Sequence, residues 1–424
     1  MKNKALSDKL KYIEPLEIPK RQPKKMKNLR ISKKFSMKKL LLITMLFPPK
    51  IGGVETMLAN IAKRLDPNNL TVLADQENEK GLTKEEKKFD AAQKYRIIRR
   101  KFLYPSKLIW PRWLPILKNA RKICKEEKIE AIFAAQVLPV GTAAMKIAQA
   151  FDIPYYVYTY GMDVEISRKH WIRGRTLKNV LKNSARIFTI SDFTKRRIEE
   201  LGINEKKMVK IPPGLDIKKF IPGKSILAKQ TEDIKKRYDL HNKKIILTLG
   251  RLVARKGQDT VIKSMPKILQ EIPNAVYVIA GRGEYKKELK KLAETKQCSN
   301  HVNFAGQFDE KEKAALYNAC DVFAMPTRIE KDIDVEGFGI VFLEANALGK
   351  PVIAGKSGGV EDAVIGDKTG LLIEDPTDET EVAEKIVRVL NDEELAERLG
   401  KAGKNRVENE FDWDRLVRQL EKYL

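Results

Sequence analysis

The chain has 424 residues, of which 42% are hydrophobic, and a formal net charge of +26. This length exceeds one ordinary hydrophobic core, so it predicts two or three folded domains. No apolar run reaches the ~20 residues of a membrane span. The three cysteines show neither a C-x-x-C nor a metal-finger spacing, which argues against a disulfide scaffold or a zinc finger and indicates a reducing compartment.

Two segments hold most of the positive charge. Residues 1–36 carry twelve Lys and Arg against three acids, and residues 94–130 also carry twelve against three. Residues 1–36 lack an apolar core of signal-peptide length, so we expect a basic tail, disordered in preference to structured. Charge concentrated in this way implies an anionic partner, which could be acidic lipid, nucleic acid or phosphate groups.

Apolar strands and amphipathic helices alternate from residue 37 onward. The run LLLITML at 40–46 is typical of a buried parallel strand, and GGVETMLANIAKRL after it has apolar residues at helical spacing. The alternation continues to the helical segment DFTKRRIEELG at 192–202. This succession predicts a doubly wound parallel sheet.

The alternation pauses in a stretch of turn residues and charge near residues 215–240, then restarts with KIILTLGRL at 244–252. The sequence therefore predicts an α/β protein with two Rossmann-like domains, at residues 37–218 and 219–410. A helix at about residues 411–424 is expected to pack back on the first domain.

Ligands of open α/β sheets bind where strands end and loops enter helices. After the first strand, Gly52 and Gly53 allow backbone N–H groups to approach an anion at a helix N-terminus; a purely structural glycine turn is the alternative. In GRLVARKGQD, Gly250 ends a strand, and Arg251 and Lys256 supply cations that suit a diphosphate leaving group. The alternative there is a solvated basic loop.

The third loop, DIDVEGFGIVFLEANAL at 332–348, holds carboxylates at the start of an apolar helix. Glu336 is expected before the helix and Glu344 about two turns into it. Carboxylates beside apolar residues need hydrogen-bond donors, and sugar hydroxyls are suitable donors. Asp332 and Asp334 match a D-x-D metal pattern that is common by chance, so no metal is expected.

The order of these motifs resembles one enzyme family. GGVE, PPGLD, GRLVARKGQD, the E-x7-E of EGFGIVFLE and GKPVIAGKSGGVEDAV together are similar to family 4 retaining glycosyltransferases, over residues 37–424. That family has the GT-B fold, in which two Rossmann-like domains face each other across a cleft. Within it, EGFGIVFLEANALGKPVIAGKSGGVEDAV most resembles phosphatidylinositol mannosyltransferases that use GDP-mannose. The resemblance implies a nucleotide-sugar donor, a lipid or glycan acceptor, and neither metal nor other cofactor.

The resemblance also implies roles for individual residues. Arg251 and Lys256 would hold the donor diphosphate opposite Gly52 and Gly53. Glu336 would bind the hydroxyls of the donor sugar, and Glu344 the nucleotide ribose. The rest of the expected donor set comprises Gly250, Phe338, Gly339, Ile340 and Val341. No side chain distinguishes a guanine from a uracil site.

One loop departs from the family pattern. Many members carry a histidine in an H-G-x-D loop of the first domain, where this chain reads TYGMDVE. Tyr160 therefore takes the place of the histidine, while Gly161 and Asp163 match. The role of the histidine is not carried over, and Asp163 becomes a candidate for positioning the acceptor.

Residues 99–118 mix cations with aromatic side chains, a composition that suits the headgroup region of an anionic membrane. The predicted contacts are Arg99, Arg100, Lys101, Trp110 and Trp113; a solvated helix with a packed aromatic side is the alternative. The expected location is cytoplasmic, at the inner face of the cell membrane.

Three other functions are alternatives to this one. The same fold could act on a soluble acceptor, such as a polysaccharide or a small sugar, with a UDP-sugar donor. A nucleic-acid-binding protein would explain the +26 charge, but no nucleic-acid module is present, so nucleic acid is not expected as a partner. An oxidoreductase would need a dinucleotide fingerprint, which AGRGE at 280–284 does not complete.

Overall fold

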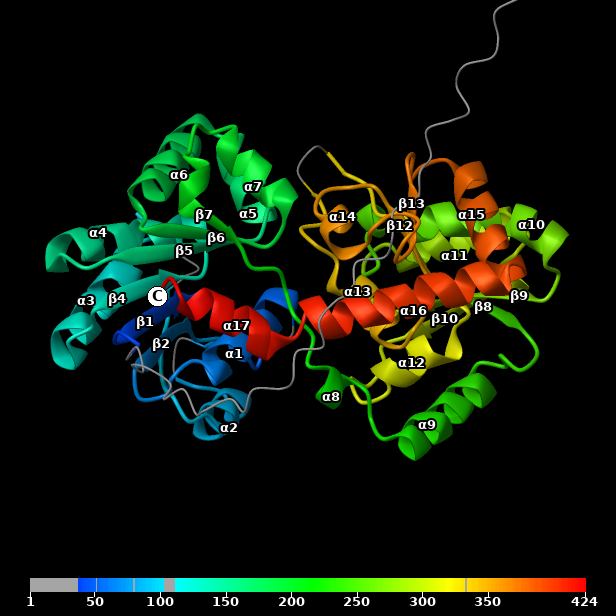
Figure 1. The fold of residues 1–424 in the computed structure, drawn as a ribbon, viewed down its shortest axis with the longest axis horizontal. Coiled ribbons are helices and arrows are strands. Elements are labelled where there is room, and N and C mark those ends of the chain that lie inside the picture. Colours follow the sequence, from blue (N-terminus) through cyan, green and yellow to red (C-terminus); the bar gives the residue numbers. More distant parts are fainter. Residues whose placement is uncertain (1–36, 51, 79–80, 103–110, 332–333) are drawn as a thin grey trace, which may run out of the picture. The chain divides into compact units, whose positions relative to one another are not determined.

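The computed structural model describes residues 37–50, 52–78, 81–102, 111–331 and 334–424. Within these ranges the chain forms two sheets of parallel strands, and helices connect successive strands, as the alternation predicts (Figure 1). The predicted basic tail lies outside the described residues.

The first sheet has the strand order β3-β2-β1-β4-β5-β6-β7. Its strands are β1 (Leu40–Thr44), β2 (Leu70–Asp75), β3 (Arg96–Arg100), β4 (Ala131–Ala134), β5 (Tyr155–Thr159), β6 (Arg186–Thr189) and β7 (Met208–Lys210). Its helices are α1 (Gly53–Arg64), α2 (Lys84–Ala91), α3 (Leu114–Glu127), α4 (Thr142–Phe151), α5 (Met162–Arg168), α6 (Trp171–Asn183) and α7 (Asp192–Glu199).

The second sheet has the order β10-β9-β8-β11-β12-β13. Its strands are β8 (Lys244–Leu249), β9 (Ala275–Ala280), β10 (Val302–Gly306), β11 (Val322–Met325), β12 (Val352–Gly355) and β13 (Leu371–Ile373). Its helices are α10 (Gln258–Glu271), α11 (Lys286–Thr295), α12 (Lys313–Ala319), α13 (Ile340–Ala347), α14 (Val360–Ala363), α15 (Glu379–Asn391) and α16 (Glu393–Glu410). Helices α8 (Ile217–Phe220) and α9 (Lys224–Arg237) connect the two sheets, and α17 (Trp413–Glu421) ends the chain.

Both sheets are buried on both faces, which explains their continuous apolar strands. In β1, Leu40 and Leu42 belong to one apolar cluster, while Leu41 and Ile43 belong to another. Successive side chains of a strand point to opposite faces, so a single strand supplies both layers of the core. In each sheet the strand order reverses direction beside the first strand, at β1 and β4 and at β8 and β11. Loops that follow these strands open at the ligand-binding edge.

Helix α17 returns to the first sheet. Asp414 forms an ion pair with Arg64 of α1, and the ring of Tyr423 lies 6.3 Å from the ring of Phe188 on β6. Upstream of α17, the amide of Leu215 donates to the carbonyl of Phe411 at 2.8 Å. The two stretches of chain that pass between the sheets are therefore hydrogen-bonded to each other.

Among the described residues, no helix is both long and apolar enough to cross a lipid bilayer.

Candidate active site

A cluster of buried charges lies just before α13. One carboxylate oxygen of Glu336 accepts hydrogen bonds from Arg255, at 2.6 Å, and from Lys256, at 2.5 Å. The Nε of Arg255 lies 2.8 Å from a carboxylate oxygen of Asp334. Two predicted residues, Lys256 and Glu336, are thus in direct contact, and Arg255 joins them.

Backbone geometry brings these residues together. Arg255 and Lys256 occupy a 3-10 turn after β8, which ends at Gly257 with a positive φ of 73°. A Cβ on Gly257 would lie 2.1 Å from the carbonyl oxygen of Pro326, so only glycine allows this approach. On the other side, a Cβ on Gly358 would lie 2.2 Å from the carbonyl oxygen of Glu336. Glycine is therefore required on both sides of the cluster.

The cluster keeps Glu336 ionised. Burial alone would raise the pKa of Glu336, but Lys256 and Arg255 outweigh it and lower that pKa to about 2. Burial lowers the pKa of Lys256, and Glu336 opposes this shift. Because both cations bind the same oxygen of Glu336, its other oxygen, Oε1, is left without a hydrogen-bond partner among the described residues and can accept hydrogen bonds from a ligand.

Glu344 lies on α13 in a second buried network. Its two carboxylate oxygens accept hydrogen bonds from Lys313, at 2.6 Å, and from the hydroxyl of Tyr317, at 2.8 Å. Helix α13 begins at Ile340, so Glu344 lies about one turn into it rather than the predicted two. The predicted start of the helix after Gly339 is correct, but the prediction overestimated the distance to Glu344, because four residues make about one turn.

The N-terminus of α13 carries the predicted backbone segment. Phe338 is buried, and its ring packs 5.8 Å from that of Phe411. The first-turn N–H groups of Ile340 and Val341 lie at the positive end of the helix dipole. The segment therefore offers a favourable environment for an anion next to Glu336.

The two other predicted loops differ in exposure. Arg251 is exposed after Gly250, and it is not part of the buried cluster. Gly52 and Gly53 begin α1, where the carboxylate of Glu55 folds back over Gly52: a Cβ on Gly52 would lie 2.2 Å from it. A phosphate at this helix end would have to displace that carboxylate.

The loop that carries Tyr160 contacts the segment before α13. A Cβ on Gly337 would lie 2.5 Å from the carbonyl oxygen of Tyr160, so the two backbones touch. Gly161 has a positive φ of 89° and caps α5. The Tyr160 ring is half-buried and stacks on Tyr158 at 5.3 Å, and its buried hydroxyl has no hydrogen-bond partner among the described residues.

Asp163 lies in the first turn of α5 and is half-buried, with its Oδ2 shielded from solvent. Its Oδ1 accepts from the amides of Tyr160 and Val164, while Oδ2 has no hydrogen-bond partner among the described residues. Burial raises the pKa of Asp163 to about 6, although those amides oppose the shift. Asp163 and Tyr160 thus hold two unsatisfied polar atoms beside the Glu336 segment.

Comparisons with known proteins show the family of the chain. Residues 51–219 match the family model described as Glycosyltransferase Family 4, and residues 230–406 match the one described as Glycosyl transferases group 1. The chain is 33% identical over 395 residues to a GDP-mannose-dependent alpha-(1-6)-phosphatidylinositol monomannoside mannosyltransferase of Mycobacterium tuberculosis, covering 92% of this chain and 98% of that relative. The chain belongs to glycosyltransferase family 4.

A second relative and a solved structure are also similar to the chain. The glycosyltransferase is 32% identical over 393 residues to a GDP-mannose-dependent monoacylated alpha-(1-6)-phosphatidylinositol monomannoside mannosyltransferase of Corynebacterium glutamicum, covering 91% of this chain and 98% of the relative. Its fold matches the crystal structure of Anabaena HepE in complex with UDP, with a TM-score of 0.75 at 19% identity over 91% of this chain and 98% of that one. The predicted GT-B fold is confirmed.

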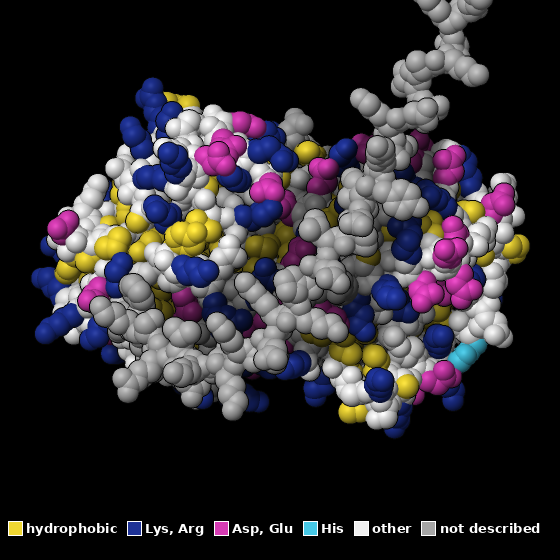
Figure 2. Space-filling model, viewed as in Figure 1, with side chains coloured by type: hydrophobic (Ala, Val, Ile, Leu, Met, Phe, Trp, Pro, Cys, Tyr) yellow, Lys and Arg dark blue, Asp and Glu magenta, His cyan; other side chains and the backbone are white. Residues whose placement is uncertain are grey.

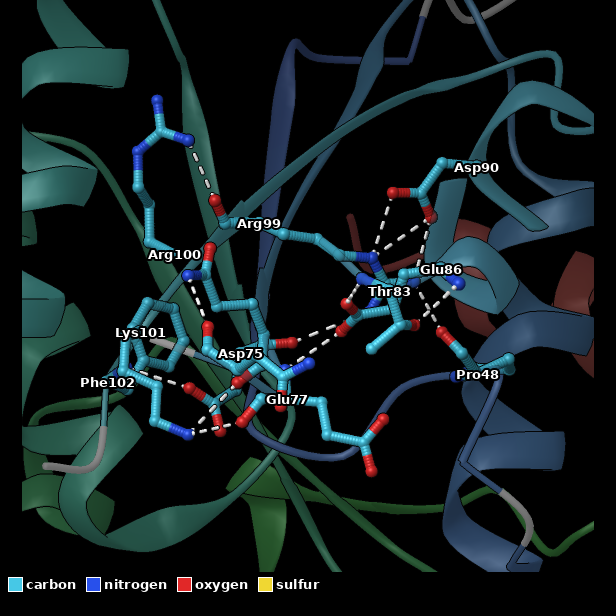
Figure 3. Close-up of polar contacts among 12 residues, drawn as sticks. Pro48, Asp75, Glu77, Thr83, Glu86, Asp90, Arg99, Arg100, Lys101 and Phe102 are labelled. Carbon is cyan, nitrogen blue, oxygen red and sulfur yellow. Dashed lines mark hydrogen bonds and ion pairs between the residues drawn. The ribbon is translucent and has the colours of Figure 1, made fainter. Parts of the chain in front are cut away.

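The predicted membrane segment of the glycosyltransferase is partly wrong. Arg99 is buried on β3, where it forms an ion pair with Asp90 at 2.8 Å and lies 3.6 Å from Glu86 (Figure 3). It also donates to the carbonyl of Pro48. Arg99 therefore holds helix α2 against the sheet and cannot reach a lipid surface.

The other residues predicted to contact the membrane differ in their exposure to solvent. Arg100 is exposed, whereas Lys101 donates to the carbonyl of Glu77 at 2.8 Å (Figure 3). Trp113 is half-buried, with the ammonium of Lys146 4.8 Å from its ring centroid. Trp110 lies outside the described residues. The composition of residues 99–118 did not reveal which cations were internal.

Sequence reasoning also missed Arg255 in the glycosyltransferase. Its guanidinium is 4% exposed and contacts both Glu336 and Asp334. The available signal was its position beside Lys256 in a glycine-terminated turn. Arginine is the cation best suited to buried carboxylates, so a position beside Lys256 favours contact with the same acid.

Proposed function

We propose that this glycosyltransferase moves mannose from GDP-mannose to a phosphatidylinositol-type glycolipid, with retention of the anomeric configuration. The observation that carries the proposal is the 33% and 32% identity, over 98% of their length, to two enzymes named for that donor and that class of lipid. The charged cluster before α13 supports the proposal, because it would supply groups that such a reaction needs.

The donor sugar is proposed to bind at Glu336. Its free oxygen, Oε1, would accept hydrogen bonds from sugar hydroxyls, and its ionised state makes those bonds charge-assisted. Glu344 would accept the ribose hydroxyls beside Tyr317. The N-terminus of α13 would place N–H groups near the phosphate.

The leaving diphosphate gains negative charge as its bond to the sugar breaks. Lys256 and Arg251 would stabilise that charge, together with the α13 N-terminus. In the retaining reaction proposed here, an oxygen of the leaving phosphate takes the proton of the acceptor hydroxyl on the face from which it departs. No metal is needed for this step, because the protein supplies the positive charge.

The acceptor is proposed to bind beside α5. Asp163 and the hydroxyl of Tyr160 carry polar atoms without partners among the described residues, and the loop between them touches the segment next to Glu336. The acceptor hydroxyl would be oriented there.

A thermal-shift screen of the full chain with GDP-, UDP- and ADP-sugars tests the donor. GDP-mannose at about 100 times its Kd should raise the stability by about 2.7 kcal/mol, and the other sugars should not. Radiolabelled mannose should then enter a phosphatidylinositol mannoside, and NMR of the product should show the α-anomer.

Two variants make this test specific. Glu336→Gln should abolish transfer, whereas Glu374→Gln removes an exposed carboxylate and should leave it unchanged. Selective stabilisation by a UDP-sugar, or transfer only to a water-soluble glycan, would replace the proposal by the soluble-acceptor alternative.

A further inference from the structure

The hairpin of α5 and α6 carries an exposed apolar group. Trp171 is 68% exposed, Ile172 52% and Ile166 45%. A tryptophan this exposed is unusual on a water-facing surface, because a large aromatic ring normally buries most of its area. The three side chains lie at the end of α5 and the beginning of α6, so they form one local feature.

Cations outnumber acids around this apolar group; the neighbouring acids Glu165 and Glu200 are both paired with Arg168. Residues 166–186 contain seven Lys and Arg and no Asp or Glu. The exposed cations are Lys169, Arg173, Arg175, Lys178 and Lys182. None of these five forms an ion pair with another described residue. In the space-filling view, dark blue Lys and Arg side chains gather where Figure 1 places α6 (Figure 2).

The arrangement on α6 is amphipathic. Trp171, Arg175, Lys178 and Lys182 follow one another at spacings of four, three and four residues, which places them on one face of the helix. The opposite face, with Leu177, Val180 and Leu181, is buried in the core. Arg175 lies 5.3 Å from the centroid of the Trp171 ring.

Helix α9 provides a contrast. It exposes Ile226 by 54%, but it also carries Glu232 and Asp233 among its lysines. An exposed isoleucine on a helix of mixed charge is an ordinary surface feature. The α6 surface combines exposed apolar side chains with charge of one sign.

We propose that the surface formed by Ile166, Lys169, Trp171, Ile172 and the cationic face of α6 docks on an anionic lipid bilayer. Tryptophan and isoleucine enter the headgroup region, and the cations bind lipid phosphates. This proposal rests on the proposed function, because a lipid acceptor explains why the enzyme would meet a bilayer. The evidence for docking is the composition of the surface alone.

The position of this surface relative to Asp163 fits a lipid acceptor. Asp163 is in the first turn of α5 and Ile166 in its second, and the helix rises by 1.5 Å per residue, so the two ends of α5 are about 10 Å apart. A glycolipid could keep its acyl chains in the bilayer at α6 while its headgroup reaches Asp163.

Co-sedimentation of the full chain with vesicles tests the surface. The vesicles contain phosphatidylcholine with about one-third phosphatidylglycerol, at low and at physiological salt. Arg175→Glu with Lys178→Glu should weaken binding by at least about 25-fold, near fivefold for each cation lost. Trp171→Ser with Ile172→Ser should weaken it by about tenfold.

Matched variants control for charge and for apolar area. Lys401→Glu with Lys404→Glu makes the same charge change on α16, and Ile226→Ser removes an equally exposed isoleucine from α9. Both should bind vesicles like the unaltered chain. Brominated phospholipids should quench tryptophan fluorescence in the unaltered chain, and Trp171→Phe should remove most of that quenching.

Equal vesicle binding by the α6 variants and their controls would overturn the proposal. So would loss of duplex DNA binding in the α6 variants with vesicle binding intact, since the surface would then serve nucleic acid. If no mannose transfer is found but vesicle binding still depends on Trp171 and Arg175, the proposed function fails and this surface stands.

Discussion

Arg255 should be energetically coupled to Glu336. The perturbation is a double-mutant cycle of Arg255→Met, Glu336→Gln and the combined variant. The pKa of Glu336 is about 2 instead of its ordinary 4.5, a difference that corresponds to about 3 kcal/mol of folding free energy. Arg255 and Lys256 together produce that difference. Arg255 is therefore expected to contribute about half of it, or ~1.5 kcal/mol.

The single variants should differ in severity. Glu336→Gln leaves two buried cations opposite each other and should destabilise by about 3–5 kcal/mol. Arg255→Met leaves Lys256 in place and should cost about 2 kcal/mol. The combined variant should be more stable than the sum of the singles predicts, by at least ~1.5 kcal/mol, because removing Arg255 relieves the repulsion.

Urea unfolding of the full chain, followed by tryptophan fluorescence and circular dichroism, gives the three free-energy differences. The exposed pair Lys356 and Glu374, 3.1 Å apart, is the control cycle and should show less than about 0.5 kcal/mol of coupling. Coupling should also fade as the pH drops from about 5 toward 2, because a carboxylate with a lowered pKa loses its contribution when it is protonated. Additive effects in the Arg255 cycle at pH 7 would refute the reasoning.

Three further outcomes are expected. Gly257→Ala should lower the unfolding free energy by at least about 1–3 kcal/mol, because its positive φ and the carbonyl of Pro326 exclude a Cβ; a melting temperature equal to that of the unaltered chain would contradict this. Asp163 has a raised pKa, so its contribution to stability is lost as the pH rises through about 6. The unfolding free energy of Asp163→Asn, relative to that of the unaltered chain, should therefore rise by about 3 kcal/mol from pH 4 to pH 8. A difference in unfolding free energy that does not change with pH would disprove this. Tyr160→Phe should keep thermal stability within about 0.5 kcal/mol, because its hydroxyl has no described partner, while kcat/KM for lipid mannosylation falls at least about fivefold; unchanged kinetics would remove Tyr160 from the acceptor site.

The fold could be predicted because it depends on a local pattern. Strands such as LLLIT at β1 are apolar throughout and are followed by helices of apolar period near 3.6, which defines a doubly wound sheet without further information. The motifs that carry Lys256 and Glu336 could also be recognised, because each lies in one short stretch of sequence. The direct contact between the two side chains was not predicted, because they are 80 residues apart.

Burial of charged residues could not be predicted in the same way. Arg99 and Arg175 both lie among basic residues, yet Arg99 is buried against α2 and Arg175 is exposed. The difference depends on whether Asp90 and Glu86 fold against the same strand. Arg255 was missed for the same reason, since its partners lie about 80 residues away. Tertiary contacts decide which cations are structural and which are free to bind a ligand or a surface.

The return of α17 to the first sheet has a consequence for synthesis of the chain. The apolar side chains of α17, among them Trp413, Leu416 and Leu420, are buried, and the hydroxyl of Tyr156 on β5 donates to the carbonyl of Leu424, the last residue. A ribosome makes these residues after both sheets. The first sheet therefore remains incomplete, with apolar surface uncovered, until α17 has been synthesised, and a fragment that ends near residue 218 should aggregate unless α17 is supplied separately.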